Sequence, residues 1–287
     1  MKIEYGVRNK SIDVTDICIN QLSRNNIITI PQWDGVRASY FTDPLEGTLK
    51  SVFVDGVEYD HSTRVQIYAD GSIHAVNENV VNSKINSIHS KLKLNHGVFT
   101  EELPEQKMVV RYLTGNEKVL EIGGNIGRNS LVIASITKHL VTLESNLSIS
   151  KQLIENRDIN NFDFHIEPSA LSKRKLIQKE WFTMPSDTLL DGHEWVNTIS
   201  FEEIQNKYNI VFDTLVLDCE GAFYYILIDM PEILNNINLI IMENDYGDIE
   251  HKNYIDCVLD RDFYIDYSEG GGWGPCQGYF YEVWKRR

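Results

Sequence analysis

The chain has 287 residues, of which 42% are hydrophobic, and it carries a formal net charge of −15 at pH 7. One hydrophobic core rarely serves a chain of this length, so we expect one large domain and a smaller one. The negative charge repels nucleic-acid phosphates and anionic membranes, which argues against both as partners. A small-molecule or carbohydrate partner fits this charge better.

The four cysteines are scattered, with no CxxC pair and no histidines at zinc-ligand spacing. This usage is typical of reduced thiols in a cytosolic protein. The first ten residues lack the apolar stretch of a signal peptide, and no apolar run reaches the length of a membrane span. We therefore expect a soluble, cytoplasmic protein.

Residues 1–95 predict a small all-β accessory domain, and residues 83–97 read as its linker to the rest of the chain. Asp-Gly pairs at 55 and 70 are typical of hairpin turns. The sequence leaves open whether this domain binds a glycan, forms a homo-oligomer contact or covers an acceptor site. The strand-like runs are NIITI at 26–30, RASYFT at 37–42, LKSVFVDG at 49–56 and RVQIYADGSIHAV at 64–76.

Residues 96–287 alternate apolar strand candidates with segments of helix length, which predicts a mostly parallel α/β sheet covered by helices on both faces. In such a sheet, ligands bind beyond the carboxyl ends of the strands. The strand candidates are 118–122, 139–145, 163–171, 213–221, 238–245, 263–269 and 278–286. The helix candidates are a segment from about Asn129, then 147–160, 200–208 and 224–234.

The first of these strands runs into a glycine-rich turn in VLEIGGNIGRNS, residues 119–130. Glycines here would let backbone N–H groups and a helix N-terminus approach a ligand closely. The spacing matches neither the G-x-G-x-x-G of dinucleotide sites nor a P-loop. Glu121 at the end of the strand would repel a phosphate, whereas it suits the ammonium and sulfonium groups of S-adenosylmethionine.

Several blocks resemble the FkbM-type branch of S-adenosylmethionine-dependent methyltransferases over roughly residues 100 to 287. Two positions depart from that family, which often has Asp where Glu121 stands and Ala where Gly124 stands. The resemblance implies a Rossmann-like methyltransferase fold, with a seven-stranded, mostly parallel sheet and an antiparallel last strand. The matching blocks are VLEIGGNIGRNS, VTLESN, PSALS, TLVLDCEGAFYYIL and LIIMEND.

Glu144 ends the second strand of this region, 21 residues after Gly123. At about this offset, an acidic side chain accepts hydrogen bonds from ribose hydroxyls; the alternative is a solvated surface glutamate. By resemblance, Ser169 and Ala170 would lie near the adenine. The expected cofactor-binding residues are Glu121, Gly123, Asn125, Gly127, Glu144, Ser169 and Ala170.

Asp218 and Glu220 follow the very apolar run DTLVL, where two carboxylates are unlikely to serve solubility alone. We expect them to be the catalytic residues, with one accepting a proton from the acceptor hydroxyl. Orienting the acceptor or the methionine amino group is an alternative, and so is capping of the next helix.

The next strand end presents Glu243, Asn244, Asp245 and Tyr246. Together with Asp218, the first three would form an all-oxygen site for Mg²⁺, so a metal is possible, although a simple acceptor-binding edge explains them equally well. We expect Glu243 and Tyr246 to contact the acceptor.

Near the C-terminus, SEGGGWGPC predicts a flexible loop that would let Trp273 pack against the apolar face of a sugar ring. The alternative is a disordered hairpin tip. His96 and His251 could reach the same edge, yet a lone surface histidine is the usual case for each.

These observations predict an S-adenosylmethionine-dependent O-methyltransferase that modifies a hydroxyl of a sugar or glycan. One alternative is an N- or protein methyltransferase. Another is a catalytically inactive glycan-binding or scaffold protein that keeps the methyltransferase fold.

Overall fold

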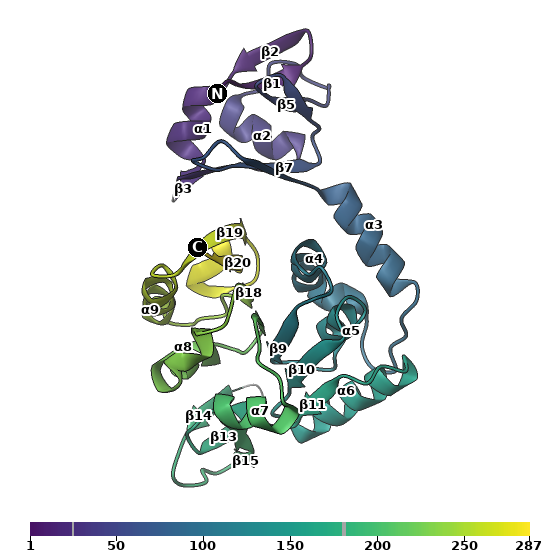
Figure 1. Cartoon of the computed structure of the whole chain (residues 1–287), viewed down its shortest axis with the longest axis vertical. Coiled ribbons are helices and arrows are strands. Elements are labelled where there is room, and N and C mark those ends of the chain that lie inside the picture. The colour runs from purple at the N-terminus through teal and green to yellow at the C-terminus, as the bar shows by residue number, and fades with distance from the viewer. Residues whose placement is uncertain (25, 180–181) are drawn as a thin grey trace. The chain divides into compact units, whose positions relative to one another are not determined.

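The computed structural model describes residues 1–24, 26–179 and 182–287. These residues divide into two compact units, Met1–Lys84 and Ile85–Arg287, whose elements are labelled in Figure 1. Within the described ranges, no helix is both long and apolar enough to cross a membrane.

The N-terminal unit contains two four-stranded antiparallel sheets, with strand orders β2-β1-β5-β6 and β3-β4-β7-β8. A shared core that includes Tyr5, Ile30 and Val65 fills the space inside the unit. Its strands are β1 Ile3–Val7, β2 Lys10–Asp13, β3 Ser23–Arg24, β4 Ile27–Ile30, β5 Ser51–Val54, β6 Val57–Tyr59, β7 Thr63–Ile67 and β8 Ile73–Asn77.

The expectation of an all-β unit was wrong in part, because the unit also contains helices α1 (Thr15–Gln21) and α2 (Asp34–Phe41). Residues 37–42, expected as a strand, lie mostly in α2. The fully buried Arg37 fixes this segment, since its guanidinium donates to three backbone carbonyls. The expected linker begins inside a third helix, α3 (Glu78–His89).

The C-terminal unit is built on a seven-stranded sheet of order β11-β10-β9-β17-β18-β20-β19. Only the last strand of the chain, β20, pairs antiparallel with its neighbours; the other pairings among the described strands of this sheet are parallel. The expected mostly parallel sheet with an antiparallel last strand is therefore confirmed. Its strands are β9 Lys118–Ile122, β10 His139–Leu143, β11 His165–Glu167, β17 Thr214–Leu217, β18 Leu239–Glu243, β19 Phe263–Glu269 and β20 Tyr281–Arg286.

Helices cover both faces of this sheet, with α4, α5 and α6 on one side and α7, α8 and α9 on the other (Figure 1). Polar caps fix where several of them start: the Asn146 side chain accepts from two N–H groups of α6, and Ser200 forms a capping box with Glu203 in α7. The helices are α4 Leu103–Tyr112, α5 Arg128–Ala134, α6 Leu147–Ile159, α7 Phe201–Tyr208, α8 Ala222–Asp229 and α9 Ile249–Leu259, with 3₁₀ turns η1 Phe99–Glu102, η2 Pro231–Leu234 and η3 Gly274–Tyr279.

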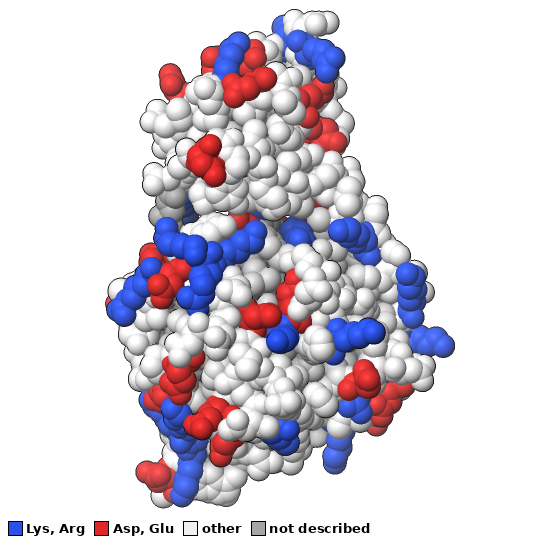
Figure 2. Space-filling view, viewed as in Figure 1, with Lys and Arg blue, Asp and Glu red and all other residues white. Residues whose placement is uncertain are grey.

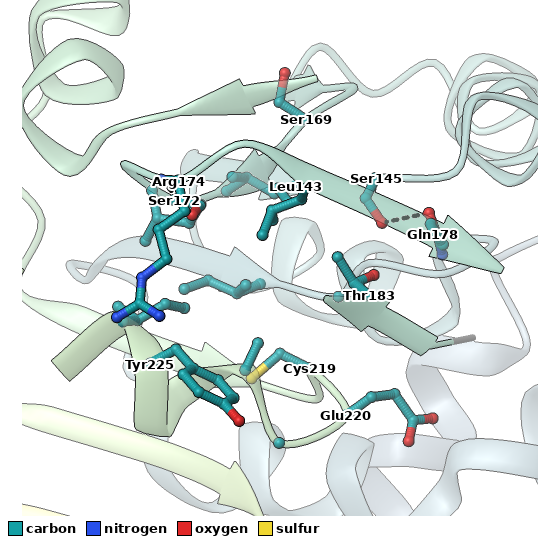
Figure 3. Close-up of a pocket in the computed structure, with 18 of the residues that line it drawn as sticks. Leu143, Ser145, Ser169, Ser172, Arg174, Gln178, Thr183, Cys219, Glu220 and Tyr225 are labelled. Carbon is teal, nitrogen blue, oxygen red and sulfur yellow. Dashed lines mark hydrogen bonds between the residues drawn. The ribbon is translucent and has the colours of Figure 1, made fainter. Parts of the chain in front are cut away.

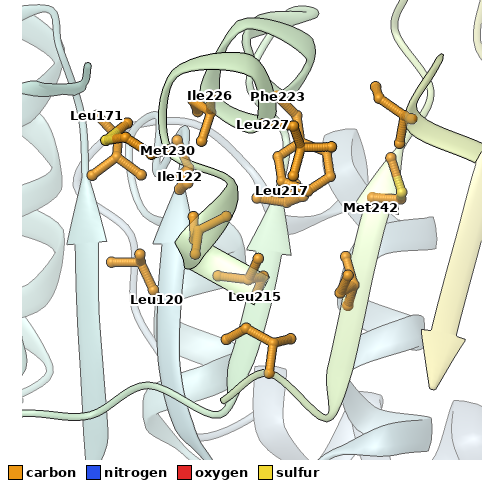
Figure 4. Close-up of a cluster of buried hydrophobic side chains, with 14 of the residues drawn as sticks. Leu120, Ile122, Leu171, Leu215, Leu217, Phe223, Ile226, Leu227, Met230 and Met242 are labelled. Carbon is orange, nitrogen blue, oxygen red and sulfur yellow. The ribbon is translucent and has the colours of Figure 1, made fainter. Parts of the chain in front are cut away.

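The α8 side of the sheet holds the main apolar core, shown in Figure 4. Leu120 and Ile122 of β9 and Leu215 and Leu217 of β17 point into it, where they meet Phe223 of α8. Because side chains alternate along a strand, the residues between them point toward α4 and α5 instead. This alternation decides which strand-end residues reach a ligand.

Between β11 and α7 the chain makes an insertion that the sequence patterns did not predict. It contains a three-stranded antiparallel sheet of order β14-β13-β15 and a two-stranded parallel pair, β12 with β16. These strands are β12 Ala170–Leu171, β13 Leu176–Lys179, β14 Phe182–Pro185, β15 Glu194–Val196 and β16 Thr198–Ile199.

The turn after β9 packs directly against the backbone after β17. Gly123 has φ +91°, and a Cβ atom there would lie 1.6 Å from the Asp218 carbonyl oxygen. At Gly124, a Cβ atom would lie 2.3 Å from Thr142 Oγ1. Glycine is therefore needed in this turn because other chain segments approach it too closely to leave room for a side chain.

We expect Gly123→Ala to lower the free energy of unfolding by about 3 kcal/mol or more, because the added methyl group adds an unfavourable φ to a backbone clash. Gly247→Ala is the matched control, since its Cβ would meet no atom within 4 Å. Chemical denaturation of both variants measures the difference. Equal stability of the two variants would contradict the close approach.

Candidate functional site

A pocket opens at the carboxyl ends of β9, β10 and β17, and it borders about 1140 Å³ of empty space, part of it open to solvent. Figure 3 shows insertion residues Gln178 and Thr183 on one side and Cys219 and Glu220 on the other. Seven of the residues predicted for the site line this pocket: Gly123, Asn125, Glu144, Ser169, Ala170, Asp218 and Glu220.

The glycine turn does not offer its N–H groups to a ligand, contrary to the expectation from sequence. Gly123 and Gly124 both donate to the Leu143 carbonyl, at 3.1 and 2.9 Å, and Gly127 donates to the Gly124 carbonyl. Asn125 N–H donates to Glu144, and Ile126 N–H donates to the Asn125 side chain. Because all five donors are used, this turn is a poor cradle for a phosphate group.

Glu144 is 8% exposed and lines the pocket. Its two carboxylate oxygens accept from Asn125 N–H at 2.9 Å and from Asn146 N–H at 2.8 Å. Burial raises its pKa, and these two backbone hydrogen bonds oppose the rise. The carboxylate is thus held in one orientation, with free lone pairs that can accept from ligand hydroxyls.

Glu121 lies on the other face of β9 and does not line the pocket, so it is not placed to hold a ligand there as expected. It accepts a hydrogen bond from Ser130 Oγ of α5. Its second oxygen, Oε1, is buried without a hydrogen-bond partner among the described residues. Burial raises the pKa of this carboxyl from 4.5 to about 7.

The turn after β17 carries Asp218 and Glu220 into the pocket wall. Glu220 adopts φ +50°, a left-handed conformation that is uncommon outside glycine and is concentrated at functional sites. Burial raises the pKa of Asp218 well above its ordinary value, and the nearby carboxylates of Asp245, Glu102, Glu105 and Glu220 add to the rise. Neither side chain caps α8, whose N-cap residue is Gly221 without a side-chain hydrogen bond, so capping does not explain them.

The insertion and α8 supply pocket residues that sequence reasoning missed. Arg174 forms a two-point ion pair with Asp229, at 2.5 and 2.6 Å, and lies over the ring of Tyr225. Ser145 Oγ donates to Gln178 Oε1 at 3.3 Å, the contact drawn in Figure 3. The stretch KLIQK, residues 175–179, does not alternate apolar and polar residues, so the sequence carried no clear strand signal here.

The possible metal ligands do not converge. Among the described residues, no group of three or more His, Cys, Asp or Glu side chains could hold a metal ion. Asn244 is instead used structurally, with its side chain donating to the Tyr279 carbonyl at 2.6 Å. Asp245 accepts from Gly221 N–H at 3.1 Å, and Glu243 pairs with Tyr281 in the sheet. The structure gives no support to Mg²⁺ at this edge.

The other expected acceptor residues also lie off the pocket wall. Tyr246 is 2% exposed and packs in the apolar core, because it follows a strand that enters that core. Trp273 is 49% exposed and does not line the pocket. His96 contacts Glu155 at 2.6 Å, and His251 stacks on Tyr224, so neither histidine belongs to the pocket.

No family model and no curated protein matches this chain. Solved structures with similarity include a ribosomal protein L11 methylase from Lactobacillus delbrueckii subsp. bulgaricus (12% identity, 65% of this chain and 79% of that one, TM-score 0.44). An O-methyltransferase from Bacillus cereus in complex with SAH matches at 12% identity (74% and 92%, TM-score 0.42). An rRNA methylase from Streptococcus thermophilus matches at 9% (64% and 94%, TM-score 0.40). With TM-scores below 0.5, these likenesses carry no argument for the activity of this chain, and the FkbM resemblance stays unconfirmed.

The buried Glu121 carboxyl predicts a specific pH dependence. Its folded-state pKa, about 7, lies above the ordinary 4.5, so its contribution to stability is complete below pH 4.5 and is lost as the pH rises toward 7. We expect Glu121→Gln to gain up to about 3 kcal/mol relative to the unmodified protein between pH 5 and pH 8. Urea unfolding across this range measures the gain, and a pH-independent difference would contradict the assignment.

Proposed function

We propose that this protein is an S-adenosylmethionine-dependent O-methyltransferase acting on a hydroxyl of a sugar or glycan. One observation carries the proposal. The pocket lies where parallel sheets bind nucleotide-like ligands, yet its glycine turn has no free N–H group for a phosphate and its inner end is acidic. A nucleoside ligand with positive charge in place of phosphates fits this combination.

The residues present fit such a cofactor. Glu144 would accept hydrogen bonds from the ribose hydroxyls, and Ser169 and Ala170 would flank the adenine against Ile122. Arg174 is the only basic residue among the described lining residues, and its ion pair with Asp229 leaves little charge for a phosphate. When bound, S-adenosylmethionine would supply an activated methyl group on its sulfonium.

The Asp218 side chain has no hydrogen-bond or ion-pair partner among the described residues, and its pKa is raised well above the ordinary value. A carboxylate with a pKa closer to neutral is a better general base, because its affinity for a proton approaches that needed by an acceptor hydroxyl. Asp218 would take that proton on its carboxylate. Glu220, whose pKa burial also raises, would orient the acceptor from the opposite side of the same turn.

A small polar acceptor fits the surface and the pocket mouth. Figure 2 shows Lys and Arg side chains interspersed with Asp and Glu over the visible face, in a chain of net charge −15. Tyr225, which lines the pocket and is 40% exposed, offers an aromatic ring of the kind that packs against sugar rings. It replaces Trp273 as the aromatic residue of the proposed acceptor site.

Isothermal titration with S-adenosylhomocysteine tests the cofactor. We expect micromolar affinity, about 8 kcal/mol, and a loss of at least about tenfold in Glu144→Gln because a neutral amide accepts ribose hydrogen bonds less well. Glu155→Gln is the control: Glu155 of α6 is exposed, contacts His96 and does not line the pocket. NAD should not bind. Absence of binding by S-adenosylhomocysteine would favour an inactive scaffold.

The Asp218→Asn substitution tests whether the Asp218 side chain accepts the proton or binds the cofactor. With an acceptor that the protein methylates, we expect turnover to fall about a hundredfold, with the affinity for S-adenosylhomocysteine changed less than about threefold. Single-turnover kinetics and titration measure the two quantities. Unchanged turnover would remove Asp218 from proton transfer.

A further inference from the structure

Helix α2 of the N-terminal unit is fastened from beneath by buried cations. Arg37 is 0% exposed and donates to three backbone carbonyls. Lys50 is 1% exposed, and its ammonium pairs with Asp34 at the start of α2 at 2.9 Å and with Asp43 just past its end at 2.8 Å. The Tyr5 hydroxyl also donates to Asp34 at 2.6 Å. Both ends of α2 are thus held against the core of the unit, which makes its outer face a rigid surface.

The outer face of α2 carries large apolar side chains. Trp33, Val36 and Tyr40 are 40%, 42% and 40% exposed, and their spacing of three and four residues places them in one row, here called the α2 row. Among the described residues 33–41, the exposed ones are these three with Gly35 and Ser39, and none is charged. Cations inside and aromatic rings outside reverse the usual arrangement. A contiguous exposed apolar patch is typical of a binding surface.

The backbone of Trp33 holds its indole in place. Trp33 has φ +73°, an outlier for a bulky residue. Its N–H donates to the His61 carbonyl at 2.6 Å, and the two rings contact each other with centroids 6.4 Å apart. Such outliers cost free energy and gather at ligand-binding surfaces. The indole is therefore fixed in an exposed position before any ligand arrives.

The size and chemistry of the α2 row narrow its occupant. Three side chains fall far short of the roughly 20 to 30 residues that a stable protein interface uses on each side. The uncharged residues exposed on the described helix give the phosphates of a nucleic acid or an anionic lipid no cation to pair with. Flat aromatic rings beside the Ser39 hydroxyl suit a neutral ligand with apolar faces and polar edges, as sugar rings have.

The spacing of the two rings selects an extended chain of sugars. Trp33 and Tyr40 lie about 10 Å apart along the helix axis, at about 1.5 Å per residue, which matches the separation of alternate rings in a β-1,4-linked glycan. We propose that the outer face of α2 binds a neutral, extended β-linked glycan, with Trp33 and Tyr40 against two of its sugars and Val36 between them. This binding function is separate from the proposed methyl transfer and does not depend on it.

Isothermal titration of the full chain with cellohexaose and chitohexaose, two neutral β-1,4-linked hexasaccharides, tests the proposal. We expect at least one of them to bind about tenfold or more tightly than maltohexaose, because α-1,4 linkages curl the chain away from a straight row. Tyr40→Ala should weaken the binding about tenfold or more, as removal of a central aromatic contact does. Leu49→Ala is the control, since Leu49 is a 64% exposed apolar residue of the same unit outside α2.

Trp33→Gly separates loss of the site from loss of the fold. Glycine adopts positive φ without strain, so this variant should melt no lower than the unmodified protein while its affinity for the hexasaccharide falls about tenfold or more. Thermal unfolding and titration measure the two quantities on the same sample.

The proposal is overturned if neither hexasaccharide binds, if maltohexaose binds equally well, or if Trp33→Gly keeps the affinity. Self-association that Trp33→Gly abolishes, measured by sedimentation, would also overturn it, because the α2 row would then serve a second copy of the chain.

Discussion

The pocket depends on the contact between the turns that follow β9 and β17. Asp218 N–H donates to the Ile122 carbonyl at 3.1 Å, and the Asp218 carbonyl occupies the space that any side chain at position 123 would need. The two turns therefore fix each other. Glu144, which follows β10, in turn accepts a hydrogen bond from Asn125 N–H. The ends of β9, β10 and β17 are therefore held together, and this backbone arrangement positions the carboxylates of Glu144 and Asp218 at the pocket.

This arrangement is costly in electrostatic terms. Asp218, Asp245, Glu105 and Glu121 all have raised pKa values, with burial as the largest cause. A fold selected for stability alone would pair these groups with cations or replace them by apolar residues. Their retention is typical of sites where stability is sacrificed for ligand affinity.

The alternation of strand and helix patterns predicted the mostly parallel α/β sheet, and the places of Gly123, Glu144, Asp218 and Glu220 at strand ends predicted them as pocket residues, because these signals are local. The seven-stranded topology and the placement of Ser169 and Ala170 came from the family resemblance. The orientation of Glu121 was also accessible, since its neighbours Leu120 and Ile122 are apolar and strand side chains alternate. The burial of Tyr246 and the helix at Arg37 were not, because long-range packing and distant carbonyls determine them. The acidic residues that raise the pKa of Asp218 include Glu105 of α4 and Asp245 after β18, and only the folded chain brings them near it.

The insertion between β11 and α7 has a consequence for how substrate preference could change. It supplies Gln178 and Thr183 to the pocket wall, yet its strands form sheets separate from the seven-stranded one. Arg174 and Asp229 join it to α8 at the pocket edge. Mutations in this small sheet can therefore reshape one wall without disturbing the strand ends that bear Glu144 and Asp218, which makes the insertion the natural place for related proteins to diverge in the molecules they accept.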